Sequence, residues 1–281
     1  MRKGHTASET VLRILSRDPV WAAYAIADLR PDLASQCRWL VSPEAGGLAL
    51  LYHGLTPPIL LTAGSQEGVA AALSHADLPS ELFLSILPWH MPAVKRHYQH
   101  ISAREMVRMV LPPGKHVPTP SRPARRLYPP DANRLIALYR HGGDYAPDAF
   151  DPDQLDDGFF FGIEDEDGTL ASAGGTHVTY RHSIGPVHYP NPEVLGVSSS
   201  IDKIISQGVA AIGNIYTRPD RRGLGYAMAV TASITRALQM EGYRVIVLNV
   251  DENNLVAKSI YEKLGFDVHC GFFEGLAARN S

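Results

Sequence analysis

Cysteine is scarce in this chain of 281 residues, which contains only Cys37 and Cys270. The two residues lie far apart in the sequence and no CxxC spacing occurs, so neither a zinc cage nor a disulfide framework is expected. His177, His182 and His188 also lack a recognised metal-binding spacing. We therefore expect no metal site, and a reducing compartment suits this cysteine usage.

Neither sign of charge dominates, because 26 Lys and Arg stand against 29 Asp and Glu. The net charge of −3 provides no basic footprint for nucleic acid and no polybasic patch for a membrane. The apolar stretch at 20–27 is short and is followed by Asp28 and Arg30, so we expect neither a signal peptide nor a membrane span. These absences predict a cytoplasmic protein with a small partner molecule.

The composition, with 45% apolar and 20% charged residues, is typical of a globular protein. The length favours two domains over one large domain, which remains the alternative. Prolines are dense between Leu111 and Pro123, and they exclude both helix interiors and central strands there. We predict an N-terminal α/β domain at 1–111, a proline-rich linker at 112–123 and a second domain at 124–281.

Short apolar runs in the first half predict strands, and helical spacing predicts helices. The expected strands cover 37–41, 47–52, 58–62, 82–87 and 104–111, and the expected helices cover 66–74 and 91–98. Strands in series, followed by strands that alternate with helices, predict a mixed sheet covered by helices.

The second half predicts a similar alternation. A helix is expected to follow its N-cap Asp131, then strands at 159–163 and 170–178, a strand at 210–217, a helix from Ala227, a strand at 243–250, a helix at 254–264 and a last strand from Phe266. Residues 181–208 read as an irregular insertion with a short helix at 201–206. The predicted fold class is α/β (α+β), with a mixed, mostly antiparallel central sheet and flanking helices.

A glycine-bearing turn at 222–227 separates the expected strand from its helix. Gly223 and Gly225 lack Cβ atoms, so the backbone there can approach a diphosphate, and Arg222 adds a positive charge. The helix N-terminus also presents free N–H groups and the positive end of its dipole. No Gly-Lys-Ser/Thr follows, and Met228 stands where the dinucleotide fingerprint needs Gly or Ala, so both nucleotide motifs fail. A simple tight turn remains the alternative.

This turn resembles the signature of the GNAT superfamily of acyl-CoA-dependent N-acyltransferases, which reads Arg or Gln, two residues, Gly, one residue, and Gly or Ala. Arg222, Gly225 and Ala227 fill that signature. Residues 215–219 are similar to the family's fourth strand and bulged turn, and the pattern on the helix after the fifth strand is matched by Asn254, Ala257, Tyr261, Gly265 and Phe266. The resemblance covers 124–277, and before the linker only the order of elements suggests a degenerate copy.

The resemblance implies that an amine attacks the thioester of acetyl-CoA, which serves as cosubstrate between a splayed fourth and fifth strand. The implied cofactor-binding residues are Ile215, Tyr216, Thr217, Arg222, Gly223, Leu224, Gly225, Tyr226, Ala227 and Asn254. Tyr261 has the family's position for protonating the departing CoA thiolate. Asn254 has a rival role as a helix N-cap, and a lone Tyr on a helix is otherwise a core residue.

The general base is where the chain departs from the family pattern, because Ala211 stands where many relatives have Glu. The remaining candidates are His177, Asp144, Asp251, Glu252 and a water chain, and a structural role is the alternative for His177. Residues 139–145 and 181–208 are expected to flank an acceptor, which is a small-molecule amine or a peptide amine. The leading prediction is an N-acetyltransferase, the alternative is a non-catalytic acyl-CoA-binding or sensing protein, and the oligomeric state stays open.

Overall fold

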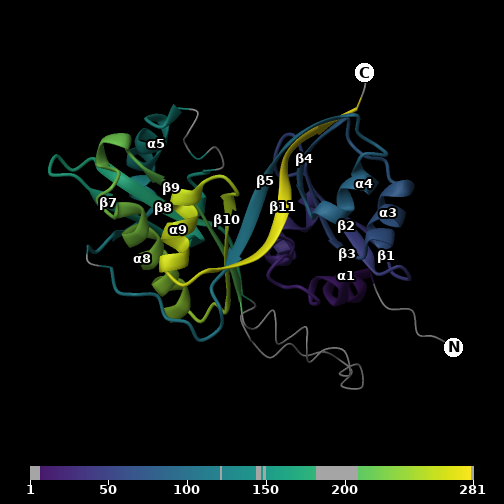
Figure 1. The fold of residues 1–281 in the computed structure, drawn as a ribbon, viewed down its shortest axis with the longest axis horizontal. Coiled ribbons are helices and arrows are strands. Elements are labelled where there is room, and N and C mark those ends of the chain that lie inside the picture. Colours follow the sequence, from purple (N-terminus) through teal and green to yellow (C-terminus); the bar gives the residue numbers. More distant parts are fainter. Residues whose placement is uncertain (1–6, 121, 144–146, 148–149, 182–207, 280–281) are drawn as a thin grey trace.

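The computed structural model describes residues 7–120, 122–143, 147, 150–181 and 208–279 (Figure 1). Its strands form one eleven-stranded sheet in the order β1-β2-β3-β4-β11-β5-β10-β9-β8-β7-β6. Only the β3–β4 and β9–β10 pairs are parallel among these neighbours. The expected mixed, mostly antiparallel sheet with flanking helices is confirmed.

The strands are β1 (Cys37–Ser42), β2 (Gly47–Tyr52), β3 (Ile59–Gly64), β4 (Glu81–Ile86), β5 (His100–Val110), β6 (Arg125–Leu127), β7 (Phe160–Glu164), β8 (Leu170–Tyr180), β9 (Val209–Thr217), β10 (Val245–Asp251) and β11 (Asp267–Ala278). The helices are α1 (Ala7–Leu15), α2 (Ala23–Ala27), α3 (Gln66–Ser74), α4 (Met91–Val94), α5 (Ala132–Arg140), α6 (Gln154–Asp157), α8 (Tyr226–Met240) and α9 (Leu255–Lys263).

The predicted strand at 47–52 and helix at 66–74 have the bounds that the structure shows. The helix expected at 91–98 is shorter, because the chain turns after Val94 to bury Tyr98, whose hydroxyl donates to the Pro79 carbonyl at 2.7 Å. Helices α1, α2 and α6 were not expected from the sequence. The predicted helix at 201–206, and all but the ends of the predicted insertion at 181–208, lie outside the described residues.

The last strand of each half, β5 in the first and β11 in the second, pairs with a strand of the other half, an arrangement that we call the strand exchange. β11, from the end of the chain, lies between β4 and β5, and β5 pairs on its other edge with β10. The proline-rich segment that follows β5 packs on the second half, where Val117 is 3% exposed and Gln239 donates to the Lys115 carbonyl at 2.7 Å. The sheet thus runs through both predicted domains, and the division at 112–123 stays a prediction.

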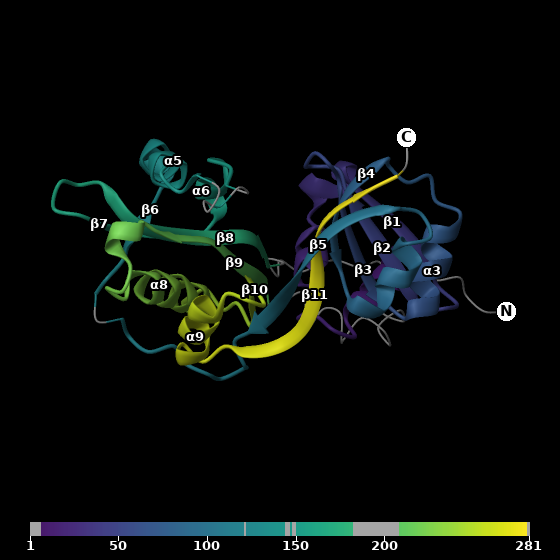
Figure 2. The same ribbon diagram turned by 45° about the horizontal axis from the view of Figure 1, so that its top comes forward.

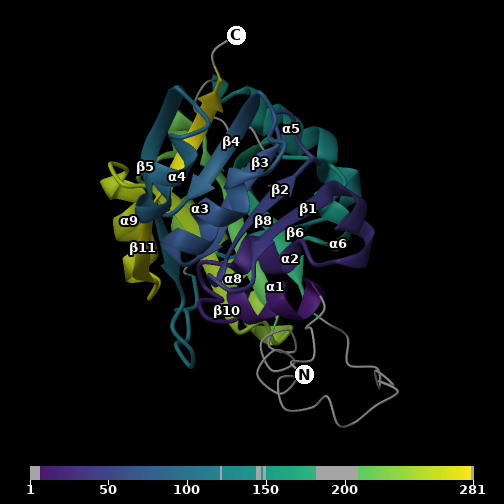
Figure 3. The same cartoon turned by 90° about the vertical axis from the view of Figure 1, so that its right-hand side faces the viewer.

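Each face of the sheet carries its own helices. One face is covered by α1 and α2 in the first half and by α5 and α6 in the second. The opposite face is covered by α3 and α4 in the first half and by α8 and α9 in the second. Figure 2 shows α5 and α6 above the strands of the second half and α8 and α9 below them, and Figure 3 shows α3 in front of the first half. Of the helices that the structure describes, none has the length and apolarity to cross a membrane.

Helix α2 belongs to the first half but packs on β8 and β9 of the second. Ala23 and Ile26 share a hydrophobic core with Val209 and Ala211, all four at most 2% exposed. Trp21, just before α2, holds the helix in place, because its Nε1 donates to the Thr62 carbonyl of β3 at 2.7 Å. The strand exchange and α2 therefore bring first-half residues against the second half.

We expect Trp21→Ala to lower the free energy of unfolding by about 3–5 kcal/mol, the usual cost of truncating a buried Trp. Trp21 is 1% exposed, and its ring lies 5.4 Å from the Phe272 ring, so a cavity would open between α2 and β11. Chemical denaturation measures the change. Trp89, which is 50% exposed, is the matched control, and Trp89→Ala should change the stability by less than about 1 kcal/mol. Equal losses for both variants would contradict this role of Trp21.

Candidate functional site

Strands β9 and β10 run parallel and then part. Their pairing joins Val209–Ile212 to Val245–Leu248, and no later pair connects them in the described chain. β9 nevertheless continues to Thr217 along β8. Backbone N–H and C=O groups need partners, so the edge of β9 beyond Ile212 is free to receive a ligand backbone. This is the splay that the family resemblance implied.

A bulge at Asn214 sits where the strands part. Asn214 has a φ of +54°, which asparagine tolerates better than most side chains, and the β8–β9 register shifts between Ala173 and Gly175. The Tyr139 hydroxyl on α5 donates to the Asn214 carbonyl at 2.8 Å and fixes the bulge. Burial raises the pKa of Tyr139, so this hydroxyl keeps its proton. The bulge re-aims the last residues of β9, including Ile215 and Tyr216.

The glycine turn after β9 is open. Gly223 and Gly225 both have a φ of +77°, and a Cβ at either position would have nothing within 4 Å. Gly225 directly precedes α8, and no side chain caps that helix. Because α8 has 15 residues, its N-terminus combines free N–H groups with a full dipole. The turn can therefore accept an anion without moving a side chain of its own.

Four arginines lie near this turn, and two of them, Arg222 and Arg122, are available to a ligand. Arg218 and Arg221 are already paired with Asp165 at 3.2 and 2.9 Å. Arg222 is exposed, contacts the Thr217 carbonyl at 3.4 Å and forms no ion pair with any described residue. Arg122, which the sequence reasoning missed, lies beside the start of α8 with its Nη1 3.3 Å from the Tyr226 hydroxyl. Arg122 stands in the proline-rich segment, where nothing in the sequence signals its approach to α8.

The corresponding turn of the first half is closed. Ser65 caps α3 by accepting from the Gly68 N–H at 3.0 Å, and a Cβ on Gly68 would lie 2.2 Å from the Gly47 nitrogen. The parallel pairing of β3 with β4 ends at Leu61, and beyond it Trp21 fills the opening through its hydrogen bond to the Thr62 carbonyl. Each half has one strand–helix–strand crossover with a parallel strand pair, β3-α3-β4 in the first half and β9-α8-β10 in the second. Of these two, only the second can receive a ligand without displacing such groups.

Helix α9 places Tyr261 in the hydrophobic core that also contains residues of α8, among them Tyr226. Tyr261 is 8% exposed, and its hydroxyl has no hydrogen-bond partner among the described residues. Burial raises the pKa of Tyr261 to about 12, so the group carries its proton at neutral pH. Asn254 is exposed and serves as the N-cap of α9, its Oδ1 accepting from the Ala257 N–H at 3.1 Å.

A polar cluster faces the parting strands from the α2 side. His177 on β8 has its Nε2 2.9 Å from Asn214 Oδ1 and its Nδ1 3.2 Å from the Tyr24 hydroxyl of α2. The imidazole lies directly over Gly213, where a Cβ would stand 2.2 Å from Nε2. Arg108 on β5 donates to Asn249 Oδ1 on β10 at 3.0 Å.

Sequence reasoning missed Tyr24, Arg108, Asn214 and Asn249. The pair Gly213-Asn214 inside an apolar strand is a signal that could have indicated the bulge. Tyr24 and Arg108 carry no such signal, because only the strand exchange brings them to the second half.

The other candidate bases are less available. Ala211 is fully buried beneath α2, which leaves no room there for a carboxylate. Asp251 accepts from the Asn253 N–H at 2.9 Å, and Glu252 is paired with Lys258 at 2.7 Å. Asp144 lies outside the described residues. Within the part of the chain that the structure describes, no three His, Cys, Asp or Glu side chains gather into a potential metal site.

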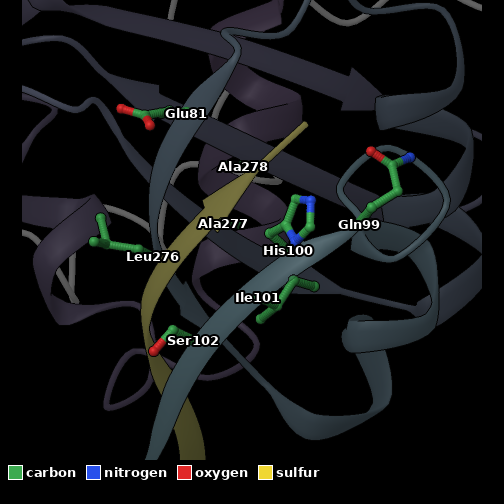
Figure 4. Close-up of a pocket in the computed structure, with 8 residues that line it drawn as sticks. All are labelled: Glu81, Gln99, His100, Ile101, Ser102, Leu276, Ala277 and Ala278. Atoms are coloured by element: carbon green, nitrogen blue, oxygen red, sulfur yellow. The ribbon is translucent and has the colours of Figure 1, made fainter. Parts of the chain in front are cut away.

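A surface hollow of about 430 Å³ lies elsewhere, between the outer ends of β5 and β11 (Figure 4). Its lining includes His100, Ser102, Leu276 and Ala278. His100 pairs with Ala278 at the opposite end of β5 from Arg108, so the hollow is separate from the parting strands. The candidate site is therefore the splay and the open turn, not this depression.

Comparisons with known proteins match the same region. Residues 195–271, which include β9, the open turn, α8, β10 and α9, match the FR47-like protein family. A mycothiol acetyltransferase from Paenarthrobacter aurescens is 39% identical over 59 residues, which is 20% of this chain and 18% of that relative. The chain thus aligns with less than a fifth of the length of that curated relative.

Solved structures share the fold over most of the chain. A GCN5-related N-acetyltransferase-like protein from Streptococcus suis has a TM-score of 0.57 at 16% identity, covering 98% of this chain and 100% of that chain. A GCN5-related N-acetyltransferase from Kribbella flavida has a TM-score of 0.57 at 16% identity, covering 92% and 96%. With the FR47-like match over the splay and the open turn, the chain thus has the fold of these GCN5-related N-acetyltransferases.

Proposed function

We propose that the chain is an N-acyltransferase that moves an acetyl group from acetyl-CoA to an amine. The observation that carries this proposal is the pairing of splayed strands with an open glycine turn at the start of α8. A pantetheine arm needs an unpaired strand edge, and a diphosphate needs free N–H groups with positive charge. Both are present within one continuous segment, from Gly213 to Ala227.

The residues divide into three tasks. The main chain at Ile215 and Thr217 hydrogen-bonds the amide groups of pantetheine, with Tyr216 between them facing α5. The turn from Arg222 to Ala227 holds the diphosphate through its backbone N–H groups, and Arg222 adds a charge-assisted hydrogen bond. Asn254 keeps its structural role as the N-cap of α9 and supports the helix that carries Tyr261.

Tyr261 supplies the proton for the departing thiolate. Its raised pKa keeps it protonated at neutral pH, and its hydroxyl forms no competing hydrogen bond with a described residue. Because its proton is in place at neutral pH, Tyr261 can donate that proton to the sulfur as the C–S bond of the thioester breaks. The amine attacks from the opposite face, where α2 and α5 lie.

The acceptor is proposed only as an amine, either of a small molecule or of a peptide. The matched mycothiol acetyltransferases favour acetyl as the group transferred. Their matches span 18% and 21% of those proteins, so their acceptor does not carry over to this chain.

A second candidate is a non-catalytic acyl-CoA-binding or sensing protein. It is favoured by Ala211, which is buried where many family members carry a carboxylate base. The experiment that separates the two is a screen of spermidine, amino acids, an aminoglycoside and a peptide with a free N-terminus, with detection of released CoA thiol. We expect acetyl-CoA to raise the melting temperature and at least one amine to release CoA. A raised melting temperature without any release would favour the sensor.

We expect Arg222→Glu to weaken acetyl-CoA binding by about 10- to 100-fold, because a hydrogen bond to a charged group contributes about 1.5–3 kcal/mol. The fold should be unaffected, since Arg222 is exposed and its one contact is 3.4 Å long. Calorimetric titration measures the dissociation constant. Arg96→Glu, which makes the same charge change on an exposed residue of the first half, is the control. Affinity equal to wild type in Arg222→Glu would rule out the diphosphate assignment.

We expect Tyr261→Phe to lower kcat by about 10²-fold, a typical contribution of a general acid. The melting temperature should stay unchanged, because the hydroxyl removed has no hydrogen-bond partner in the described structure. Steady-state kinetics with the best amine of the screen measures the effect. An unchanged kcat would remove Tyr261 from the mechanism, whereas an unchanged kcat with a lower melting temperature would assign it to the core.

A further inference from the structure

The hydrogen bonds around His177 define which of its ring nitrogens carries the proton. Gln154 on α6 is oriented by two contacts, its Oε1 accepting from the Asp151 N–H at 3.3 Å and its Nε2 donating to the His177 carbonyl at 3.4 Å. That Oε1 also accepts from Asn214 Nδ2 at 3.5 Å, so Asn214 turns its Oδ1 toward the imidazole. An amide oxygen only accepts, and therefore His177 Nε2 is the protonated nitrogen.

The other nitrogen, Nδ1, then holds the lone pair and accepts from the Tyr24 hydroxyl at 3.2 Å. This direction is also the one that Tyr24 favours, because burial raises its pKa to about 12 and keeps it a neutral phenol. Within the described residues, a chain of donors thus runs from Tyr24 through His177 to Asn214. Both ends of the imidazole are oriented by neighbours from different halves of the protein.

Tyr24 lies on the α2 side of the parting strands. Its neighbours Ala23 and Ala25 are fully buried, while Tyr24, His177 and Gly213 are each partly exposed. The α2 face lies opposite the face of α8 and α9, which carries the open turn and Tyr261. On the α2 side, His177 joins the Tyr24 hydroxyl to the bulge at Asn214, so an acceptor that reaches the bulge from that side meets this pair.

We propose that Tyr24 and His177 form the proton relay of the acyl transfer, with Tyr24 of the first half meeting the acceptor amine. The inference rests on the proposed N-acyltransferase function and assigns the base that Ala211 leaves missing. Tyr24 is the catalytic residue that contacts the amine, His177 receives the proton, and Asn214 positions His177. The first half thus contributes part of the active site.

The proton transfer balances within these residues. As the N–H bond of the amine breaks, its proton passes to the Tyr24 oxygen while the Tyr24 proton passes to His177 Nδ1, and the nitrogen keeps the electron pair. Tyr24 ends as a neutral phenol and His177 as an imidazolium, whose Nε2–H remains bonded to Asn214 Oδ1. Arg108, with its guanidinium carbon 5.0 Å from the centre of the Tyr24 ring, stabilises negative charge on the phenol oxygen during the transfer. The imidazolium then returns its proton to solvent.

Three variants test the relay. Tyr24→Phe keeps the ring against Arg108 and removes only the hydroxyl. His177→Gln keeps an amide N–H for Asn214 but cannot be protonated near neutral pH. We expect each variant to lower kcat by about 10²-fold, the low end of general acid–base catalysis. The double variant should fall no further than the single ones, because residues that act as a unit are not additive.

Matched measurements separate the relay from a structural role. The acetyl-CoA dissociation constant and the melting temperature should stay near wild type in both single variants. Tyr98→Phe, which removes a buried hydroxyl bonded to the Pro79 carbonyl in the first half, is the control and should keep the wild-type kcat. Losses of kcat that multiply in the double variant would overturn the relay.

The outcomes also distinguish this inference from the proposed function. A wild-type protein that releases CoA with an amine, together with full activity of Tyr24→Phe or His177→Gln, would overturn the relay and leave the transferase intact. A wild-type protein that binds acetyl-CoA but releases no CoA with any amine of the panel would overturn the transferase, and the relay with it.

Discussion

The pairing of β5 with both β10 and β11 is the constraint on which the rest of the structure depends. Each half has a strand–helix–strand crossover with one parallel pair, and each closing strand sits beside the other half's crossover. Hydrogen bonds along β5 and β11 therefore join the halves into one sheet. Helix α2 is fixed on β8 and β9 as a result, since Trp21 anchors it to β3. Through α2, the first half therefore lines one side of the candidate site.

The two parallel crossovers also show why one of them can hold a ligand and the other cannot. In the first half, Ser65 caps α3 and Trp21 occupies the edge of β3 beyond the paired residues. In the second half no side chain caps α8, because Gly223 and Gly225 adopt a left-handed conformation at the turn that precedes this helix. Similar backbone geometry thus gives a packed core in one case and an open turn in the other.

Local patterns explain which parts of this arrangement were predictable. Apolar runs and helical spacing located β2 and α3, and the glycine turn with its flanking residues carried the family resemblance that implied the splay. The pairing partners of β5 and β11 were not predictable, because strand exchange is decided by contacts between residues more than a hundred positions apart. Tyr24 and Arg108 were missed for the same reason. The bulge at Asn214 was predictable in part, since the pair Gly213-Asn214 indicates an irregular strand but does not define the register with β8.

The placement of Arg108 adds a reason for the strand exchange to matter in catalysis. Its guanidinium is fully buried and lies 4.5 Å from the centre of the Trp21 ring, and it reaches β10 through Asn249. A buried cation costs desolvation energy, which aromatic faces, the Asn249 amide and the Trp21 carbonyl offset only in part. Such a charge is easier to explain beside a site where negative charge develops than in a purely structural core. In the proposed relay, Tyr24, in contact with Arg108 and His177, is the group through which that charge acts on the acceptor.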